Sequence, residues 1–415
     1  MKSSNARATP GTRPDGISTR TALLLAFASG AAVANVYYAQ PLLERIGHDL
    51  GVGPAGLGLV TTVTQAGYFL GLILIVPLGD LFNRRVLIPA GCVISAIALV
   101  AVAVAPGSLT FLVASGIVGL AAVVQQVIIA YAAVLSSPRL RGRVLGIVTS
   151  GVVIGILLAR TVSGLVADLL GWRSVFVVSA VLMVVVALVL VRRLPSETTT
   201  ASPAVYRRLI LSVVTLSVQE RVFRVRSLLS LFMFAGFGAL WGSIALPLSA
   251  EPWHMSTSEV GLFGLVGAAG AFGAARAGTL ADRGLAQWVT GVVLVLFALS
   301  WIPIAWLPHS LIPLIIGILV IDLAGQALHV TNVHLILQID PAASSRLVGS
   351  NMVYYSVGTG IGAIAATSVY SAWGWGAVCI LGAGFSAAAL LIWISDRITS
   401  GRGGSNTAIT TTATL

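Results

Sequence analysis

The chain has 415 residues, of which 57% are hydrophobic and only 9% are charged. A soluble domain carries about 25% charged residues, so this composition excludes a soluble globular protein and predicts that lipid surrounds most of the chain. The formal net charge of +11 is also typical of nucleic-acid-binding proteins. The positions of the arginines, however, are explained by membrane topology, as described below. We therefore expect no nucleic-acid partner.

Twelve segments are long and apolar enough to span a membrane, which takes about 20 mostly apolar residues. They lie at about 21–41, 55–78, 86–105, 109–136, 143–168, 173–194, 227–249, 258–280, 285–307, 311–338, 346–371 and 374–395. We therefore predict an all-α membrane protein of twelve transmembrane helices. Its parts are a disordered tail at 1–20, a six-helix bundle at 21–194, a linker at 195–226, a second six-helix bundle at 227–395 and a disordered tail at 396–415.

The positive charges predict the orientation of these helices. Lysines and arginines near helix ends stay on the cytoplasmic side. If both termini are cytoplasmic, all but three of the 24 lysines and arginines lie in inward-facing tails, loops and helix ends, the exceptions being Arg45, Arg160 and Arg173. We expect a multi-pass protein of the inner (plasma) membrane with both termini in the cytoplasm.

Uncharged polar and aromatic side chains lie within several spans and are candidates for lining a substrate cavity. In the first half they are Asn35, Tyr38, Thr61, Gln65, Tyr68, Gln125 and Gln126. In the second half they are Trp241, Gln326, Asn332, Asn351, Tyr354 and Tyr355. Amides, hydroxyls and aromatic faces suit an uncharged or amphipathic small solute. For Tyr37, Tyr38 and Trp241, a place in the aromatic belt at the membrane boundary is the alternative.

The fifth span contains an arginine beside a strip of small residues. Gly151, Gly155, Ala159 and Ser163 recur every fourth residue, a spacing that lets two helices approach closely in lipid. We expect this strip to pack against a helix of the other half. Arg160 lies about 100° around the helix from the strip, and an arginine near a helix centre costs roughly 3 kcal/mol on insertion scales. It therefore faces a cavity or a partner; snorkelling to the outer interface is the alternative.

The tenth span carries the one acidic residue that lies deep within a predicted helix. Asp322 is followed by Gln326 and His329, which lie within about 60° of the same helix face. An intramembrane carboxylate beside a histidine is typical of a proton relay, so Asp322, His329 and Arg160 are the candidates for coupling to protons. The alternative is a polar patch that holds helix ten to its neighbours. We expect Arg160 to support Asp322 electrostatically across the two halves.

The two halves of the chain are similar to each other when the sequence is shifted by 203 residues. Arg143 then aligns with Arg346, and Gly171 with Gly374. Parallel repeats of this kind occur in transporters, whose substrate site lies near the membrane midplane between the halves. The repeat predicts two pseudo-symmetric bundles that rock about a central site.

Two short segments occupy the same place in the two halves, "GDLFNRR" at 79–85 and "GTLADRG" at 278–284. Through them the chain resembles the major facilitator superfamily, whose members carry Gly-x-Leu-x-Asp-Arg between helices two and three and a weaker copy between helices eight and nine. "NVYYAQPLL" at 35–43 and "DLAGQALHVTN" at 322–332 are similar to a branch of its bacterial proton-coupled drug and sugar exporters.

This resemblance implies a conformational latch at the two segments. Its residues are Gly79, Asp80, Arg84 and Arg85 in the first copy and Gly278, Asp282 and Arg283 in the second. The alternative is an ordinary positively charged cytoplasmic loop. Asn83 stands where the family usually has aspartate, Ser115 replaces an arginine of helix four, and Arg160 replaces the proline of a Gly-Pro pair. The exporters' usual coupling residues therefore do not carry over at these positions.

The sequence favours a transporter over other classes of membrane protein. It contains no metal-ligand cluster, no Ser-His-Asp set and no Walker-type phosphate loop, so we expect no enzyme, no metal and no cofactor. We predict a monomeric secondary transporter, with protons and a small molecule as partners and membrane lipid around it, that exports a drug-like or sugar-like solute as an antiporter. A facilitated or proton-coupled importer is the alternative, and a transport-silent sensor is a third class.

Overall fold

A computed structural model describes residues 17–136, 140–195, 215, 218–267, 276–277, 280–339 and 344–410. Every element within these ranges is a helix. The first half consists of α1 (Thr19–Ala34), η1 (Gln40–Leu42), α2 (Leu43–Leu50), α3 (Pro54–Leu74), α4 (Leu78–Leu81), α5 (Arg84–Ala103), α6 (Ser108–Ala122), α7 (Val124–Leu135), α8 (Arg141–Leu170) and α9 (Trp172–Arg193). The second consists of α11 (Arg221–Ser243), α12 (Ala245–Ser249), α13 (Thr257–Val266), η3 (Ala281–Leu285), α15 (Ala286–Leu299), α16 (Trp301–Ala305), α17 (Leu311–Leu337) and α18 (Ser344–Thr410).

The helices of the described ranges account for the twelve predicted spans. Nine are long and apolar enough to cross a membrane. One of these, Leu347–Thr399, contains two spans, because Gly374 adopts φ 74° and turns the chain. The two shorter apolar helices, α1 and α13, are the first and eighth spans. The twelve-helix fold predicted from the sequence is therefore confirmed.

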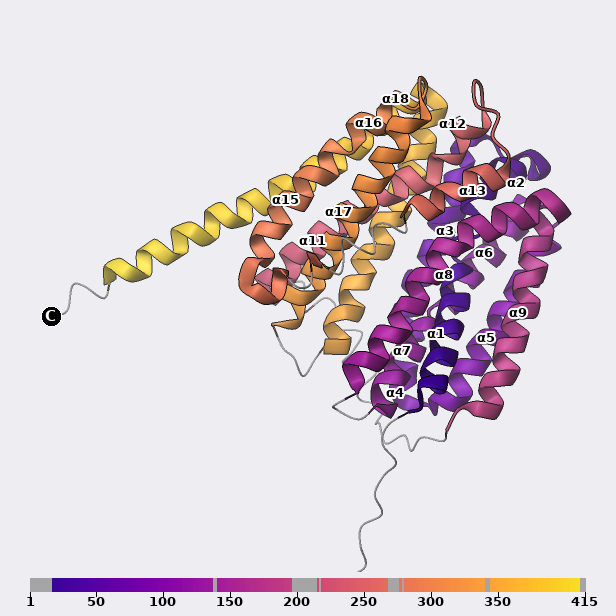
Figure 1. The fold of residues 1–415 in the computed structure, drawn as a ribbon, viewed down its shortest axis with the longest axis horizontal. Coiled ribbons are helices and arrows are strands. Elements are labelled where there is room, and N and C mark those ends of the chain that lie inside the picture. Colours follow the sequence, from indigo (N-terminus) through magenta and orange to yellow (C-terminus); the bar gives the residue numbers. More distant parts are fainter. Residues whose placement is uncertain are drawn as a thin grey trace, which may run out of the picture.

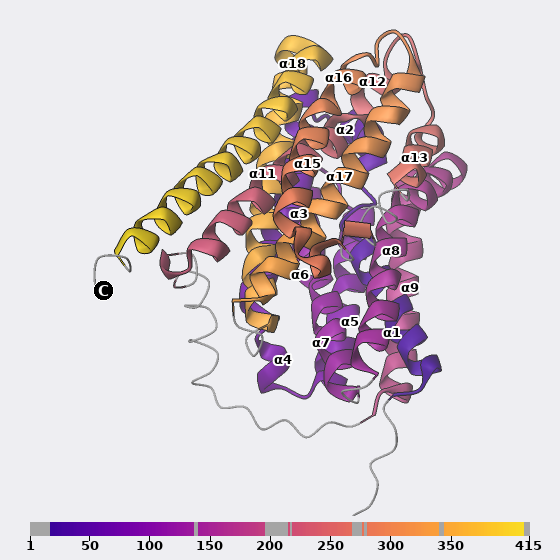
Figure 2. The ribbon, with the colours of Figure 1, turned by 60° about the vertical axis from the view of Figure 1, so that its left-hand side comes forward.

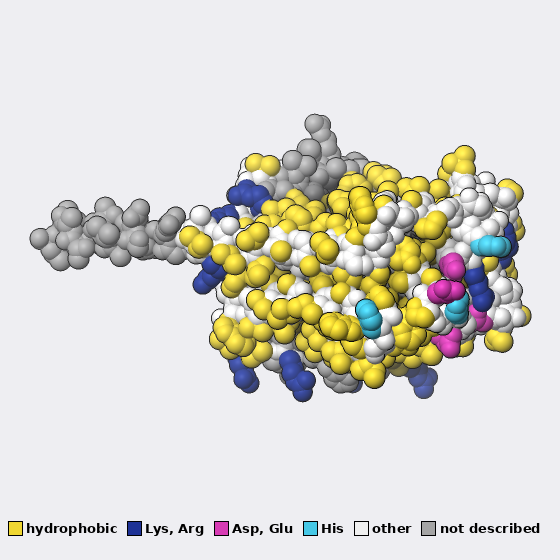
Figure 3. Space-filling model, turned by 90° about the horizontal axis from the view of Figure 1, so that it is seen from above, with side chains coloured by type: hydrophobic (Ala, Val, Ile, Leu, Met, Phe, Trp, Pro, Cys, Tyr) yellow, Lys and Arg dark blue, Asp and Glu magenta, His cyan; other side chains and the backbone are white. Residues whose placement is uncertain are grey.

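The helices form two bundles that lie side by side, one coloured indigo to magenta and the other salmon to yellow in Figures 1 and 2. One apolar core is built from α1 through α9, with Leu246 of the second half reaching into it, and the other from α11 through α18. Large apolar side chains also cover the outside: Leu109, Trp373 and Ile380 are each 75% exposed. Figure 3, which views the molecule from above, shows apolar side chains over much of the surface, with the acidic side chains gathered toward the right-hand side. Apolar residues on both sides of each helix are expected where lipid replaces water.

Two helix ends differ from the sequence prediction. α11 begins at Arg221, inside the predicted linker 195–226, and α18 continues to Thr410, where a disordered tail was expected at 396–415. One cluster supports both extensions: the Arg221 guanidinium lies 2.9 Å from Asp396 Oδ1 and also donates to the Thr399 hydroxyl. Residues 196–214 and 216–217 of the linker, the N-terminal tail up to residue 16 and the last residues 411–415 lie outside the described residues.

Glycines bring the first and fifth spans into backbone contact. A Cβ added to Gly30 of α1 would lie 2.5 Å from the Gly151 carbonyl oxygen, and one added to Gly155 of α8 would lie 2.3 Å from the Gly30 carbonyl oxygen. The small-residue strip of α8 thus packs against α1 of its own half. The expectation that this strip meets the other half was wrong, because Gly30 on α1 offers an equally small surface.

The two halves join at the end of the molecule that carries α2 and α12, at the top of Figure 1. We call this the closed end. Five hydrogen bonds between the halves lie toward it: Tyr37–Tyr355, Thr62–Gly360, Thr161–Gly261, Ser258–Asp168 and Thr367–Ala55. The opposite end carries α4 and η3, and we call it the open end.

The contacts across the halves follow the internal repeat. A Cβ on Gly58 of α3 would lie 2.7 Å from the Ala363 carbonyl oxygen of α18, and a Cβ on Gly261 of α13 would lie 2.5 Å from the Arg160 carbonyl oxygen of α8. The same 203-residue shift relates Gly58 to Gly261 and Arg160 to Ala363. The two crossings are therefore equivalent in backbone packing, although only one of them contains an arginine.

The contact between α1 and α8 can be tested with two substitutions on one helix. Gly155→Ala is expected to destabilise the fold by about 1–3 kcal/mol, because the added methyl has no space. Gly146→Ala is the matched control, since no atom lies within 4 Å of its added carbon and alanine favours a helix. Thermal unfolding in detergent measures both. Equal midpoints for the two variants would contradict the close packing of these helices.

Candidate functional site between the two halves

Arg160 lies between the two halves, near the closed end. Its side chain is only 7% exposed. The guanidinium carbon lies 3.9 Å from the Trp241 ring centroid and 5.3 Å from the Tyr37 ring centroid, and Nε donates to Gln40 Oε1 at 2.8 Å. Trp241 comes from α11, whereas Tyr37 and Gln40 come from the first half. Cation–π contacts strengthen when they are removed from water, so both halves accommodate this charge.

Asp322 on α17 is 6% exposed, and its Oδ2 atom has no hydrogen-bond partner. No nitrogen of the Arg160 guanidinium lies within the 4.0 Å of an ion pair with it, although the two charges attract each other at longer range. Among the acidic side chains that the structure describes, this carboxylate is the buried one. The arrangement is therefore a buried carboxylate that lies toward Trp241, with one oxygen unpartnered and with Arg160 of the opposite half at longer range.

Two glycines of α13, Gly261 and Gly264, and Gly267 directly after its end lie against both charged residues. Thr161 beside Arg160 donates to the Gly261 carbonyl oxygen at 3.0 Å. A Cβ on Gly264 would lie 3.0 Å from the Arg160 Cβ, and a Cβ on Gly267 would lie 2.6 Å from Asp322 Oδ2. The spacing of three places Arg160 and Asp322 beside successive turns of one helix face. This glycine series was not among the candidates predicted from the sequence, although the pattern "GLFGLVG" at 261–267 contains the signal.

His329 and Tyr355 belong to an aromatic cluster in the second half. The His329 ring packs edge-on against Phe234, with centroids 5.7 Å apart, and its Nδ1 atom is buried without a partner. Phe234 also packs against Tyr355, with centroids 3.8 Å apart, and against Phe237. Gln326 is half-buried on the same helix as His329. Tyr355 then reaches the other half through the hydrogen bond between its hydroxyl and that of Tyr37.

The polar candidates of α3 and α7 form a second group. The Tyr68 hydroxyl accepts from Gln125 Nε2 at 2.8 Å and from Gln126 Nε2 at 3.4 Å. Gln65 is 1% exposed, and neither atom of its amide has a partner; its Cβ lies near Gly360 of α18 in the other half. Thr61 is also buried. Asn351 on α18 is buried with an unpartnered amide as well. Unpartnered buried amides are costly and are expected where a solute or water binds.

Four other candidates have partners within their own half. The Ser179 hydroxyl of α9 donates to Asn35 Oδ1 at 2.7 Å, and Tyr38 also lies toward Ser179. Asn332 accepts from Arg226 and donates to Ser230, while Tyr354 packs edge-on against Phe223. Each of these four residues has a partner within its own half, although Asn35 Nδ2 has none, and their role in lining a cavity between the halves stays a prediction.

Arg226 is a buried charge that the sequence did not single out. Its side chain is 1% exposed and donates to Thr290, to Asn332 and, at 2.7 Å, to Gln287 Oε1. It thus links α11, α15 and α17 inside the second bundle. Because it lies at the edge of the predicted linker, it resembles an ordinary cytoplasmic arginine. No local sequence pattern distinguishes it from its exposed neighbours Arg221 and Arg224.

The expected latch segments both lie at the open end. Asn83 accepts from the Arg85 backbone N–H at 2.9 Å and so caps α5, which gives the asparagine at this position a structural role. Arg84 is 8% exposed, whereas Arg85 and Arg283 are exposed. Gly79 packs against Arg84 and Val127. Gly278 and the side chains of Asp80 and Asp282 lie outside the described residues.

The tyrosine pair across the halves can be tested by a double-mutant cycle. Tyr37→Phe and Tyr355→Phe each remove the same hydrogen bond. Each should therefore shift the free-energy difference between the closed and the open arrangement of this end by about 0.5–1.5 kcal/mol toward the open one. The double variant should shift it by no more than either single variant does. Spin labels at the exposed positions Glu44 and Glu251 report the populations. Tyr38→Phe, which faces α9, is the control. Additive effects, or an equal effect of Tyr38→Phe, would refute the coupling.

Comparisons with known proteins agree with this architecture. Residues 23–338 match the Major Facilitator Superfamily. The "Uncharacterized transporter YgaY" of Escherichia coli O157:H7 is 41% identical over 378 residues, covering 91% of this chain and 95% of the relative. The "Inner membrane transport protein YnfM" of Escherichia coli (strain K12) is 26% identical over 271 residues, covering 64% of each chain.

The solved structures contain the same fold. A bacterial homolog to the human lysosomal transporter Spinster, in an inward-facing and occupied conformation, superimposes with a TM-score of 0.77. The likeness covers 92% of this chain and 97% of that chain at 18% sequence identity, and it concerns the fold alone. Because the family match extends over most of the sequence, this chain belongs to the major facilitator superfamily of membrane transporters.

Proposed function

We propose that the protein exports a small uncharged or amphipathic solute in exchange for protons. The observation that carries this proposal is Asp322, a buried carboxylate with one oxygen unpartnered and with Arg160 of the other half at longer range. An ionised carboxylate away from water is costly unless it is paired or neutralised. A proton from the membrane gradient is the simplest neutralising partner, and carboxylates inside membrane bundles commonly serve proton transfer.

The coupling follows from the positions of the two charges. Arg160 is held by Gln40, Tyr37 and Trp241 rather than by Asp322. A rocking motion of the halves changes the Arg160–Asp322 separation, because the residues belong to different halves. When the guanidinium approaches, the carboxylate releases its proton; when the guanidinium withdraws, a proton takes its place. His329 lies two turns further along α17 and is the second candidate on the proton path.

The side chains between the halves favour an uncharged or amphipathic solute. Tyr355 and the rings packed with it offer apolar faces, and Gln65 and Asn351 offer free amides. Sites of this kind, mostly apolar with a few polar groups, suit uncharged or amphipathic molecules. An importer, facilitated or proton-coupled, is the second candidate. Facilitated import differs from the main proposal in that an uncoupler leaves it unchanged.

The arginine distribution orients the molecule in this proposal. The ends of α9, α11 and α5 at the open end carry Arg192, Arg193, Arg221 and Arg85, so the open end faces the cytoplasm. The conformation is then inward-facing, with the closed end outside. In the opposite conformation the segments at 79–85 and 278–284 approach each other, which fits their proposed role as a latch.

Reporter fusions test the orientation. Reporters placed after residue 205 and at the C-terminus are both expected to lie in the cytoplasm, because these positions follow basic helix ends. Alkaline phosphatase and green fluorescent protein fusions measure this in whole cells. The fluorescent reporter should therefore be active at both positions and the phosphatase at neither. A periplasmic signal from either position would contradict the orientation.

Asp322→Asn tests the proton coupling. The amide keeps the shape but cannot carry a proton cycle, so uncoupler-sensitive efflux of the probes ethidium and isopropyl thiogalactoside should be abolished. Exchange of labelled for unlabelled probe in proteoliposomes should persist, because it needs no net proton movement. Glu44→Gln removes an exposed carboxylate and should leave both activities intact. Uphill export by Asp322→Asn at the parent's rate would refute the proposed role.

A further inference from the structure

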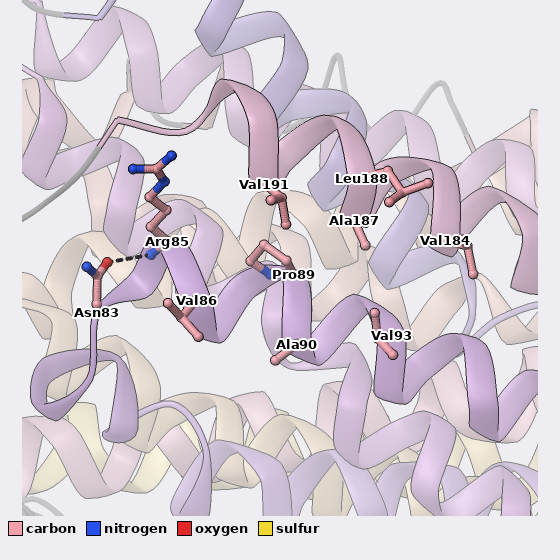
Figure 4. Close-up of a pocket in the computed structure, with 10 residues that line it drawn as sticks. All are labelled: Asn83, Arg85, Val86, Pro89, Ala90, Val93, Val184, Ala187, Leu188 and Val191. Atoms are coloured by element: carbon pink, nitrogen blue, oxygen red, sulfur yellow. Dashed lines mark hydrogen bonds between the residues drawn. The ribbon is translucent and has the colours of Figure 1, made fainter.

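A groove lies between α5 and α9 on the outside of the first bundle, remote from the Arg160 site (Figure 4). Its volume is about 590 Å³. The lining consists of one polar end and a series of apolar side chains: Asn83, Arg85, Val86, Pro89, Ala90, Val93, Val184, Ala187, Leu188 and Val191.

Small residues create this groove. Ala90 and Ala187 leave space between the helices, and Pro89 of α5 is part of the wall (Figure 4). Val86, Leu188 and Val191 are 68%, 53% and 52% exposed, so the groove opens outward from the bundle. In a membrane this face meets hydrocarbon, and the natural occupant of the groove is an acyl chain.

The groove has the length of a lipid chain segment within one leaflet. From Arg85 to Val93 the helix rises about 12 Å. One leaflet contributes about 15 Å of hydrocarbon. A chain that begins at the interface beside Arg85 can therefore follow the groove for most of the depth of its leaflet.

The charge at the mouth of the groove favours an anionic headgroup. Arg85 is exposed at the open end, and Arg192 and Arg193 follow directly after the groove residue Val191. No described carboxylate lies within ion-pair distance of these three guanidinium groups. Arginine binds phosphate through two parallel hydrogen bonds, and each basic residue near an anionic membrane surface adds to the attraction.

We propose that this groove binds one anionic phospholipid, with an acyl chain between α5 and α9 and the phosphate on Arg85. The site is separate from the solute path, and the proposal depends only on the membrane-spanning fold. Because Asn83 caps α5 at the same point, the bound lipid stabilises the helix start next to the first latch segment.

Native mass spectrometry of the full-length protein tests the proposal. The probes are phosphatidylglycerol and phosphatidylcholine with identical acyl chains. The parent is expected to retain one phosphatidylglycerol in preference to phosphatidylcholine. Arg85→Gln should weaken phosphatidylglycerol binding about fivefold. Arg143→Gln, which removes an exposed arginine from the same end of the molecule on α8, should leave it unchanged.

A second pair of variants tests the acyl chain. Ala90→Trp fills the groove from an exposed position and should weaken the binding of both lipids. Ile97→Trp is the control, because Ile97 lies on the same helix, is 65% exposed and is not part of the lining. It should leave the binding of both lipids unchanged. Four outcomes would overturn the proposal: equal retention of the two lipids by the parent, equal effects of the two arginine variants, unchanged binding by Ala90→Trp, or a protein dimer that Ala90→Trp dissociates.

Discussion

A guanidinium group in the apolar depth of a membrane must be surrounded by protein, because exposure to lipid costs about 3 kcal/mol on insertion scales. For Arg160 the surrounding groups come from both halves, with Gln40 and Tyr37 on one side and Trp241 on the other. Separation of the halves at the closed end removes part of this environment. The accommodation of one charge is therefore tied to the conformational change that a major facilitator protein undergoes.

Glycine makes this arrangement sterically possible. α13 approaches Arg160 and Asp322 so closely that a methyl group at Gly264 or Gly267 would press on them. The helix thus separates two opposite charges by about one turn without a direct ion pair. Backbone proximity, rather than a salt bridge, sets the geometry of the site. A larger side chain at either glycine would displace α13 and with it the contact between the halves.

The pseudo-symmetry of the backbone is broken by chemistry. Arg160 corresponds to Ala363 under the 203-residue shift, and Asp322 corresponds to Gly119. A Cβ on Gly119 would lie 1.9 Å from the Thr64 carbonyl oxygen, so the first half uses this position for close packing of α6 on α3. The first half contributes Arg160 and has the small Gly119 at the position equivalent to Asp322. The second half contributes Asp322 and has the small Ala363 at the position equivalent to Arg160. The repeat supplies the architecture, and the different residues at these two positions supply the asymmetry on which the proposed proton coupling depends.

The sequence by itself determined the protein class, the twelve spans and the two related halves, because each depends on local composition and periodicity. It also directed attention to Arg160 and Asp322, since few charges lie within its spans. The tertiary structure decided which polar residues lie between the halves. Asn35 and Gln40 are near neighbours in sequence, yet Asn35 contacts Ser179 and Gln40 contacts Arg160. Because α1 ends at Ala34 and η1 begins at Gln40, helical periodicity cannot predict which way each side chain points. Trp241 reaches Arg160 from the other half, and Arg226 is buried by three helices. Such contacts arise only when helices distant in sequence pack together, and a hydropathy pattern contains no information about which helix will be the neighbour.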